Sequence, residues 1–216
     1  MGSGRVPVAV ALVVLLGACA AAFIIGTPAR SLRGADAARS LLETWRASRR
    51  ATFVVESDFS RTLPDGQQLK ESTRIVQRPP YDRLTFGFGS IAGRLGGKVY
   101  RCAAQPDGSS TCLTSTAAPN YDSEVDGEVG TLASYVQGPR PLYRVIDFAD
   151  SPGRCYRLDL AIDLPVPPYG RQALFCFDRL TLAPSHTVIV RDEATDRTEA
   201  RAVRGQVVDS DLQVPS

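Results

Sequence analysis

The sequence predicts an α+β fold, mainly antiparallel β, in which a single curved sheet forms an incomplete half-barrel with one N-terminal and one mid-chain helix. A series of short runs in which apolar and polar residues alternate predicts the strands, and two segments with helical spacing predict the helices. Tight turns separate the runs at short intervals, which favours antiparallel neighbours over a doubly wound α/β fold. Four cysteines in two local pairs add two hairpin disulfides to this expectation.

An uncharged apolar segment lies near the start of the chain, from Val6 to Gly26. About 20 apolar residues are what an α-helix needs to cross a membrane, and this run is longer than the apolar core of a cleaved signal peptide. We therefore expect a signal anchor and linker over residues 1–33, with the transmembrane segment at about 6–26, and one domain over 34–216. The alternative is a lipoprotein, because Leu16-Gly17-Ala18-Cys19 resembles a lipobox in which Cys19 becomes lipidated.

The cysteines and the basic residues bear on the compartment. An even number of cysteines beyond the apolar segment suits an oxidising environment. Lys70 and Lys98 are the only lysines among 25 basic residues, a bias that we interpret as a GC-rich bacterial genome. We therefore expect a single-pass protein of a bacterial cell membrane whose C-terminal domain is extracytoplasmic. The net charge of +2, without a basic stripe, argues against nucleic acid as a partner.

Two segments have the spacing of amphipathic helices. The first begins near Asp36, a candidate N-cap, and its apolar residues recur at helical spacing up to Trp45. The second covers 121–137, where Ser123 and Asp126 form a capping box and Gly138 follows as a stop signal. Both helices are expected to lie on one side of the sheet.

The strands follow from runs of alternating residues bounded by turn signals, such as Leu63-Pro64-Asp65-Gly66 in the first hairpin. Besides the runs around the first two domain cysteines, the strands expected along the chain are 53–59, 68–77, 84–88, 143–148, 155–162, 173–182, 187–190 and 202–208.

The domain cysteines are placed to bridge two hairpins. Pro106-Asp107-Gly108 is a turn signal midway between Cys102 and Cys112, so antiparallel strands that leave this turn place the two cysteines opposite each other. Cys155 and Cys176 stand at the outer ends of two alternating runs joined by a proline-rich connection. Opposed Cα atoms in an antiparallel pair lie about 4.5 to 5.5 Å apart, which a disulfide tolerates. A metal site is the alternative, but the C-x2-C spacing of zinc sites is missing.

Motifs for catalysis or cofactor binding are missing from the sequence. It has no G-x-S-x-G elbow, no phosphate-binding loop and no H-E-x-x-H helix, so we expect no enzyme and no cofactor.

Four acidic residues resemble the opening of an EF-hand loop, namely Asp122, Glu124, Asp126 and Glu128. The twelfth position is Ala133, so acids that favour a helix N-terminus are the preferred interpretation over calcium. His186 is expected in a turn, and the basic segment 138–144 is expected to be a stiff crossover loop, with contact to an anionic headgroup or a protein as its alternative.

The order of these elements resembles the LolA, LolB and LppX superfamily of bacterial envelope proteins. Residues 76–84 (VQRPPYDRL) are similar to the family's strand that ends in a proline and a turn, and residues 208–215 (VDSDLQVP) are similar to its closing strand. The resemblance implies an incomplete barrel around a hydrophobic cavity that carries the acyl chains of a lipid or lipoprotein. Two disulfides and an uncleaved anchor depart from the family pattern, so lipid would be handled by a tethered domain.

Apolar strand residues are the candidates for lining such a lipid cavity: Phe53, Val55, Phe59, Leu84, Phe86, Phe88, Leu158, Leu160, Phe175 and Phe177. A filled core produces the same alternation as a cavity, so both interpretations stay open. The leading hypothesis is a membrane-tethered extracytoplasmic domain that binds or carries a lipid or lipopeptide without covalent chemistry. The alternative is a protein-interaction or sensor ectodomain of an envelope complex, with a filled core and a protein partner.

Overall fold

The structure is a computed structural model that describes residues 32–105, 110–115, 118, 120–148 and 153–214. The expected transmembrane segment at 6–26, Cys19 and the turn at 106–108 lie outside these residues. Within the described part of the chain, no helix is long and apolar enough to cross a membrane.

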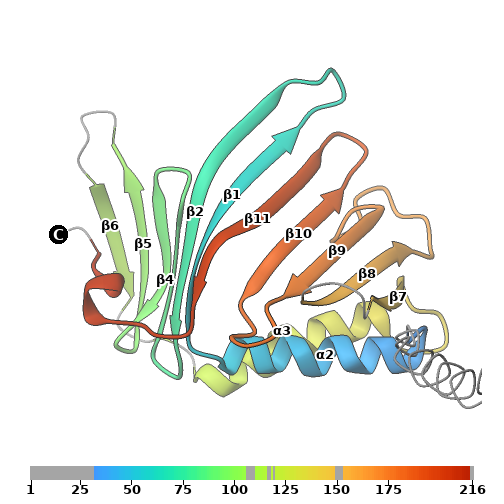
Figure 1. Cartoon of the computed structure of the whole chain (residues 1–216), viewed down its shortest axis with the longest axis horizontal. Coiled ribbons are helices and arrows are strands. Elements are labelled where there is room, and N and C mark those ends of the chain that lie inside the picture. The colour runs from blue at the N-terminus through green and yellow to red at the C-terminus, as the bar shows by residue number, and fades with distance from the viewer. Residues whose placement is uncertain (1–31, 106–109, 116–117, 119, 149–152, 215–216) are drawn as a thin grey trace, which may run out of the picture. The chain divides into compact units, whose positions relative to one another are not determined.

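Eleven antiparallel strands of the described residues form one sheet, in the order β6-β5-β4-β3-β2-β1-β11-β10-β9-β8-β7 (Figure 1). The two ends of this order, β6 and β7, are not paired with each other, so the sheet is open as expected. The elements in chain order are α2 (Ala35–Arg50), β1 (Phe53–Thr62), β2 (Gln68–Arg78), β3 (Asp82–Gly87), β4 (Ser90–Leu95), β5 (Lys98–Ala104), β6 (Ser110–Ser115), α3 (Tyr121–Val136), β7 (Tyr143–Phe148), β8 (Arg154–Leu160), β9 (Gln172–Phe177), β10 (Pro184–Val190), β11 (Thr195–Arg204) and the 3-10 helix η2 (Asp209–Leu212).

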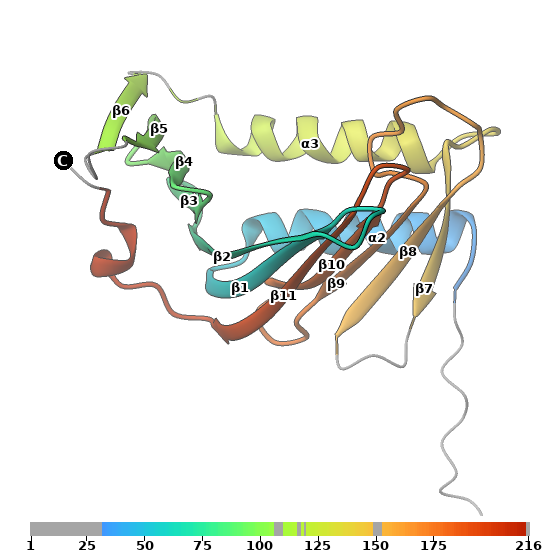
Figure 2. The ribbon, with the colours of Figure 1, turned by 90° about the horizontal axis from the view of Figure 1, so that it is seen from above.

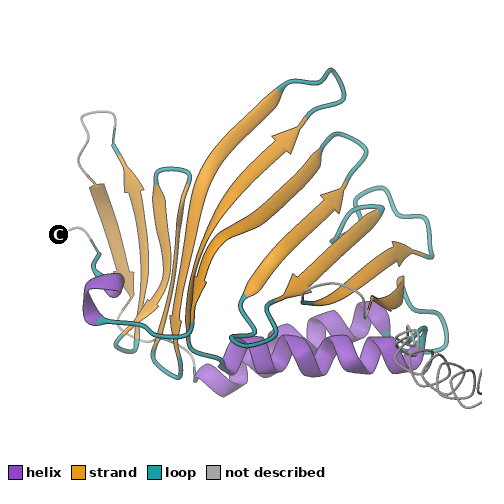
Figure 3. Ribbon diagram, viewed as in Figure 1, coloured by secondary structure: helices purple, strands orange, loops and turns teal. Residues whose placement is uncertain are grey.

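Both helices lie on one side of the sheet, which we call its inner face (Figures 2 and 3). They pack on β7 to β9, and the sheet bends so that β3 to β6 rise beside the start of α3 (Figure 2).

The expected helix caps differ from those in the structure. The N-cap of α2 is Gly34 without a side-chain hydrogen bond, and Asp36 lies in the first turn. At α3 the side chain of Asn120 accepts hydrogen bonds from the backbone N–H groups of Asp122 and Ser123, so the capping box expected at Ser123 and Asp126 is wrong.

The two faces of the sheet carry separate apolar clusters. The inner cluster joins the helices to the strands and contains Ala37, Ala38, Leu41, Leu42, Tyr121, Val125, Val129, Leu132, Val136, Tyr143, Val145, Tyr156, Leu158, Ala173, Phe175 and Phe177. The outer cluster contains Val54, Val76, Leu84 and Leu212. Neighbouring strand residues point to opposite faces, which is why Val54 belongs to the outer cluster whereas Val55 belongs to a third, smaller one with Phe53 and Ala183.

Both expected disulfides are confirmed. Cys102 and Cys112 lie directly opposite each other on β5 and β6, and Cys155 and Cys176 do so on β8 and β9. Each bridge therefore joins the two strands of one hairpin.

Several expected strand bounds are wrong. The last strand covers Thr195–Arg204 instead of 202–208, and the segment at 208–215 contains η2 instead of a closing strand. The strand expected to reach 182 ends at Phe177, because Asp178 accepts backbone hydrogen bonds from Leu180 and Thr181 and turns the chain. Strand β4 was not expected, and His186 lies on β10 instead of in a turn.

Candidate functional site

The inner face of the sheet has two parts that differ in what covers them. We call the inner face of β7 to β10 the packed half, because the helices cover it. We call the inner face of β2 to β6 the open half, because α3 contacts it only near its own start.

The packed half is filled by side chains. The ring of Trp45 on α2 meets the rings of Phe175 and Phe177 edge-on, with centroids 5.2 and 5.8 Å apart. The hydroxyl of Tyr156 is 2.9 Å from that of Ser40 and 2.7 Å from that of Thr44, so this buried polar group is satisfied by α2. A cavity of about 180 Å³ remains at the border with the open half. Trp45, Arg49, Phe53, Arg83, Glu128 and Phe175 are among its lining residues.

Two small side chains of the open half, those of Thr85 and Ala92, leave space above the sheet. Thr85 on β3 pairs with Ala92 on β4, which in turn pairs with Arg101 on β5, and all three are exposed. Between these strands and α3 opens a cavity of about 340 Å³, which we call the trough. The trough is lined by Arg83, Thr85, Ala92, Gly93, Arg94, Val99, Tyr100, Arg101 and Glu124.

A cluster of charges from α2, α3 and β4 borders the trough, with buried guanidinium groups and partly exposed carboxylates. Arg49 on α2 pairs with Glu124 at 2.9 Å and with Glu128 at 2.8 Å, both from α3. Arg94 on β4 pairs with Glu124 at 2.8 Å. The ring of Tyr121 lies beneath both guanidinium groups, 5.8 Å from that of Arg49 and 5.0 Å from that of Arg94. These contacts fix α2, α3 and β4 to one another.

Arg83 belongs to the same cluster but has a different environment. Its Nη1 donates a hydrogen bond of 2.7 Å to Oε1 of Gln77, and none of the ion pairs among the described residues includes it. Burial of the guanidinium, followed by the positive charge of Arg49, lowers the pKa of Arg83 to about 10. Arg83 lines both the trough and the smaller cavity, so it connects the two spaces.

Gln77 holds Arg83 in place. Its side chain is fully buried, and Nε2 donates hydrogen bonds of 2.7 Å to the backbone carbonyls of Ser48 and Ala51 at the end of α2. The carbonyl of Ser48 also accepts from the backbone N–H of Ala51 at 3.2 Å, so the amide adds to the hydrogen bonds at the end of α2 while its oxygen accepts from Arg83.

Two aromatic residues form a rim at the other end of the open half. The rings of Phe59 on β1 and Phe88 in the turn after β3 meet edge-on with centroids 5.0 Å apart. Phe88 has a φ of 54°, which is unfavourable for a bulky residue, and remains 54% exposed. An exposed apolar ring in a strained turn is a candidate contact for an apolar ligand.

The residues expected to line one lipid cavity occupy three places in the structure. Phe53, Val55, Phe59, Leu158, Leu160, Phe175 and Phe177 are on the inner face, and Phe88 is at the rim. Leu84 and Phe86 pack on the outer face in the cluster that includes Leu212. Leu84 and Phe86 therefore do not share a cavity with the others, because their strand parity directs them away from the helices.

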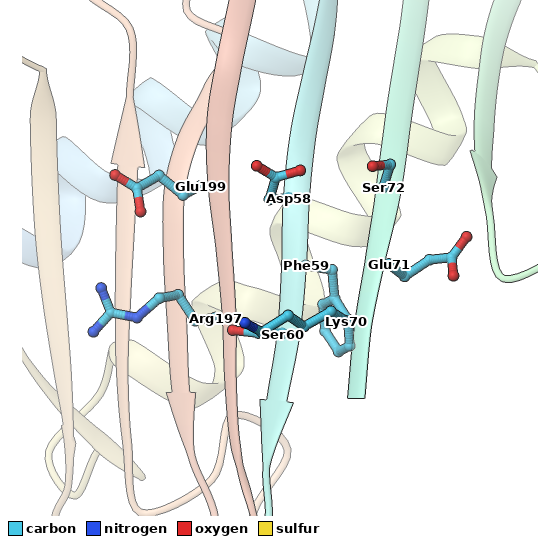
Figure 4. A pocket seen from close by; sticks show the side chains of 8 residues that line it. All are labelled: Asp58, Phe59, Ser60, Lys70, Glu71, Ser72, Arg197 and Glu199. Atoms are coloured by element: carbon cyan, nitrogen blue, oxygen red, sulfur yellow. The ribbon is translucent and has the colours of Figure 1, made fainter. Parts of the chain in front are cut away.

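A depression on the outer face is lined by polar side chains of both signs (Figure 4). Its volume is about 390 Å³, and Asp58, Lys70, Arg197 and Glu199 extend from adjacent strands around it. Asp58 also pairs with Arg201 at 3.3 Å. Alternating charges on an open sheet surface form a solvated face, so the depression is a weaker candidate than the trough.

The acidic residues of α3 are paired with arginines. Glu124 and Glu128 bind Arg49, Asp122 binds Arg50 at 2.9 Å, and Asp126 lies 3.5 Å from Arg46. Among the described residues no group of three or more acidic, histidine or cysteine side chains is placed to hold a metal ion.

The structure also places two other features of the sequence, His186 and part of the basic segment 138–144. His186 lies opposite Cys176 on the outer face, and burial lowers the pKa of its imidazole. Of the basic segment 138–144, the last two residues belong to β7. The hydroxyl of Tyr143 donates to the carbonyl of Gly170 at 3.0 Å, so Tyr143 is part of the core.

Comparison with protein-family models gave no match, and comparison with curated proteins gave none. Among solved structures, the chain is similar to LprF from Mycobacterium bovis, with 12% identity over 86% of this chain and 100% of that chain and a TM-score of 0.42. It is also similar to a LolA superfamily protein from Nitrosomonas europaea, with 9% identity over 81% of this chain and 96% of that chain and a TM-score of 0.35. The family that the sequence resembles is thus among the structural matches, but at these identities and scores no argument about function follows from them.

Proposed function

We propose that this domain is the extracytoplasmic part of a membrane-tethered, non-catalytic protein that binds one acyl chain of a lipid or lipopeptide on its open half. The observation that carries the proposal is the trough of about 340 Å³, which opens on a sheet face that is filled elsewhere. This volume lies within the roughly 300 to 1,000 Å³ that is typical of sites for small ligands.

The surfaces around the trough suit an elongated amphiphile. Small side chains such as Thr85 and Ala92 leave its floor accessible, and the rim of Phe59 and Phe88 adds apolar surface. Arg83 and Phe88 are five residues apart on one strand and turn, which corresponds to roughly 16 Å. A ligand with a polar head and one extended chain therefore fits the distance from the charged cluster to the aromatic rim.

The filled packed half limits where the chain of the ligand can lie. The cavity at its border is about 180 Å³, which is below the usual size of a ligand site. The inner cluster occupies the rest of the space between the helices and β7 to β9. The proposed chain therefore lies over β3 to β5 and not beneath α2.

The proposed tether is the uncharged segment at 6–26, and the disulfides favour an oxidising compartment for the domain. Intact-mass measurement of the membrane-extracted chain and of its Cys19→Ser variant separates the two forms of attachment. An uncleaved mass in both proteins supports the anchor. A shorter, lipid-modified mass that is lost in Cys19→Ser identifies a lipoprotein.

A protein partner is the second candidate function. Val166 and Leu180 are 86% and 94% exposed in the connections on either side of β9, and the interior is filled over the packed half. Exposed apolar side chains of this kind favour contact with another surface.

Native mass spectrometry of the full-length chain, made in an oxidising compartment and released from a mild detergent, tests the proposed function. Ala92→Trp fills the trough from its exposed floor, and Ser72→Trp adds the same ring to an exposed position on the outer face as a control. We expect a stoichiometric lipid adduct on the wild type and on Ser72→Trp, and its loss from Ala92→Trp. An unmodified wild-type mass that persists after incubation with envelope lipids would exclude acyl binding and favour the protein partner.

A further inference from the structure

We infer that Arg83 binds the anionic headgroup, a phosphate or a carboxylate, of an amphiphile whose chain lies on the open half. The inference rests on the proposed function and specifies the chemistry of its ligand.

The charges in the cluster do not balance without a ligand. Arg49, Arg83 and Arg94 lie in one cluster with two partly exposed carboxylates, those of Glu124 and Glu128. Glu124 is paired with Arg49 and Arg94, and Glu128 accepts from Nε1 of Trp45 at 2.8 Å in addition to its pairing with Arg49. Both carboxylates are therefore engaged, and Arg83 is left without an acidic partner among the described residues. A bound anion would supply that partner.

The guanidinium of Arg83 retains donors for such an anion. A guanidinium has five N–H groups, and the one hydrogen bond that the Arg83 side chain makes to another described residue uses Nη1. Because Gln77 is itself held by the carbonyls of Ser48 and Ala51, the position of Arg83 is set before a ligand arrives. Guanidinium groups match the planar geometry of carboxylates and phosphates, which makes a positioned arginine a suitable headgroup contact.

The partial burial of Arg83 is consistent with a binding role. Burial and the nearby charge of Arg49 lower its pKa, so the fold holds this cation at a cost in stability. An anion delivered to the trough would reverse that cost. The exposed Arg101 lines the same trough and adds positive charge along the entry to Arg83.

Binding of four probes tests the inference on the full-length chain, kept soluble by an uncharged amphipathic polymer. The probes are dodecyl phosphate, dodecanoate, dodecyl maltoside and inorganic phosphate, each below its micellar concentration. Trp45 is the only tryptophan of the chain and lines the cavity that Arg83 also lines, so its emission reports binding. We expect the two anionic amphiphiles to bind at least about 10-fold more tightly than either dodecyl maltoside or inorganic phosphate.

Three variants test whether Arg83 causes the preference for anionic amphiphiles. Arg83→Gln should weaken both anionic amphiphiles about 10- to 100-fold and leave dodecyl maltoside unchanged, since charge-assisted hydrogen bonds are lost. Arg83→Lys should retain part of the preference because it keeps the charge. Arg144→Gln removes an exposed arginine from β7 and should bind as the wild type does. If Arg83→Gln fails to fold by circular dichroism, the wild-type preference and Arg83→Lys decide the question.

The outcomes separate this inference from the proposed function. Equal binding of anionic and neutral amphiphiles, or an unchanged preference in Arg83→Gln, overturns the role of Arg83 and leaves acyl binding in place. If inorganic phosphate binds as tightly as dodecyl phosphate, the claim that the ligand is an amphiphile is overturned, and the site binds free anions. Failure of every probe to bind overturns both proposals.

Discussion

The packed half and the open half belong to the same face of one sheet, yet the first is a filled core and the second carries the proposed ligand site. On β8, Leu158 is fully buried beneath the helices, whereas on β5 the inward-facing Val99 is half-buried and lines the trough. Both residues are apolar and lie on the inner face of antiparallel strands. The difference is therefore set by what lies above the strand and not by the strand itself.

The helices cover only part of the sheet because both pack over β7 to β9, and at the start of α3 Glu124 binds Arg94 on the inner face of β4. The boundary between the two halves is consequently a polar one. Arg49, Gln77 and Arg83 occupy it, and the small cavity lies beside them. A core and a candidate binding site can thus share one sheet when a charged cluster separates them.

The largest contrast is expected from shortening an inward-facing side chain in each half. Leu158→Ala should lower the free energy of unfolding by about 2 to 5 kcal/mol, because it leaves a cavity in a close-packed core. Val99→Ala should lower it by less than about 1 kcal/mol, because the side chain already faces an open trough. Chemical denaturation of both variants checks this, and similar losses in both would contradict the division into two halves.

Removing one disulfide from each half sharpens the comparison. The bridges close segments of 21 and 10 residues, and the loop-entropy estimate is about 3 kcal/mol for each. We expect replacement of both Cys155 and Cys176 by alanine to lower the free energy of global unfolding by this amount. The pair at Cys102 and Cys112 should lose less than half of it, because β6 is an edge strand that can separate locally. Denaturant midpoints measure both, and a greater loss from the β5–β6 pair would count against the account.

The outer face of the open half depends on the C-terminal segment that carries Leu212. Asp211 accepts from Arg74 at 2.9 Å and from the backbone of Val208 at 2.9 Å, and a hydrogen bond from Arg204 is the main cause of its lowered pKa. A carboxyl with a lowered folded pKa stabilises the fold above its unfolded value of 3.8 and loses this as pH falls through the folded value.

Asp211→Asn should therefore be less stable than the wild type by about 2 kcal/mol at pH 7. The difference should become smaller as the pH falls below 3.8 toward the lowered folded pKa of Asp211. Thermal unfolding of both proteins between pH 7 and pH 3 measures the difference, and a gap that persists or widens in acid would show that the charge of Asp211 does not hold the segment.

The smallest effect on stability is expected at Arg83. Arg83→Gln removes the hydrogen bond to Gln77, and it also removes a buried cation without an acidic partner among the described residues. These two contributions oppose each other, so the free energy of unfolding should change by less than about 1 kcal/mol. A loss above about 3 kcal/mol in denaturant unfolding would indicate that Arg83 is mainly structural.

The fold class was accessible from the sequence because its signals are local. A turn between two alternating runs predicts a hairpin, and cysteines at matched positions predict the bridge between Cys155 and Cys176. Strand β4 was missed because Gly93 and Arg94 interrupt its apolar alternation. The last strand was misplaced because the charged residues at its start conceal its period.

The candidate site was less accessible, since it depends on contacts between distant segments. Arg83 carries no motif, and its importance follows from Arg49 and Gln77, which lie on α2 and β2. The acidic residues at the start of α3 were weighed as calcium ligands or helix-favouring charges, whereas Glu124 bridges Arg49 and Arg94. Strand parity does place Leu84 on the face opposite Thr85, but parity alone does not say which face the helices cover.

The most direct test of the central claim is to locate a bound acyl chain. The full-length chain is irradiated with a fatty acid that carries a photoactivatable diazirine near its end, and the crosslinked peptides are identified by mass spectrometry. The account predicts adducts within β3 to β5 and at Phe88, which Ala92→Trp removes and Ser72→Trp retains. Adducts confined to α2 and β7 to β9, or an Ala92→Trp pattern identical to that of the wild type, would contradict it.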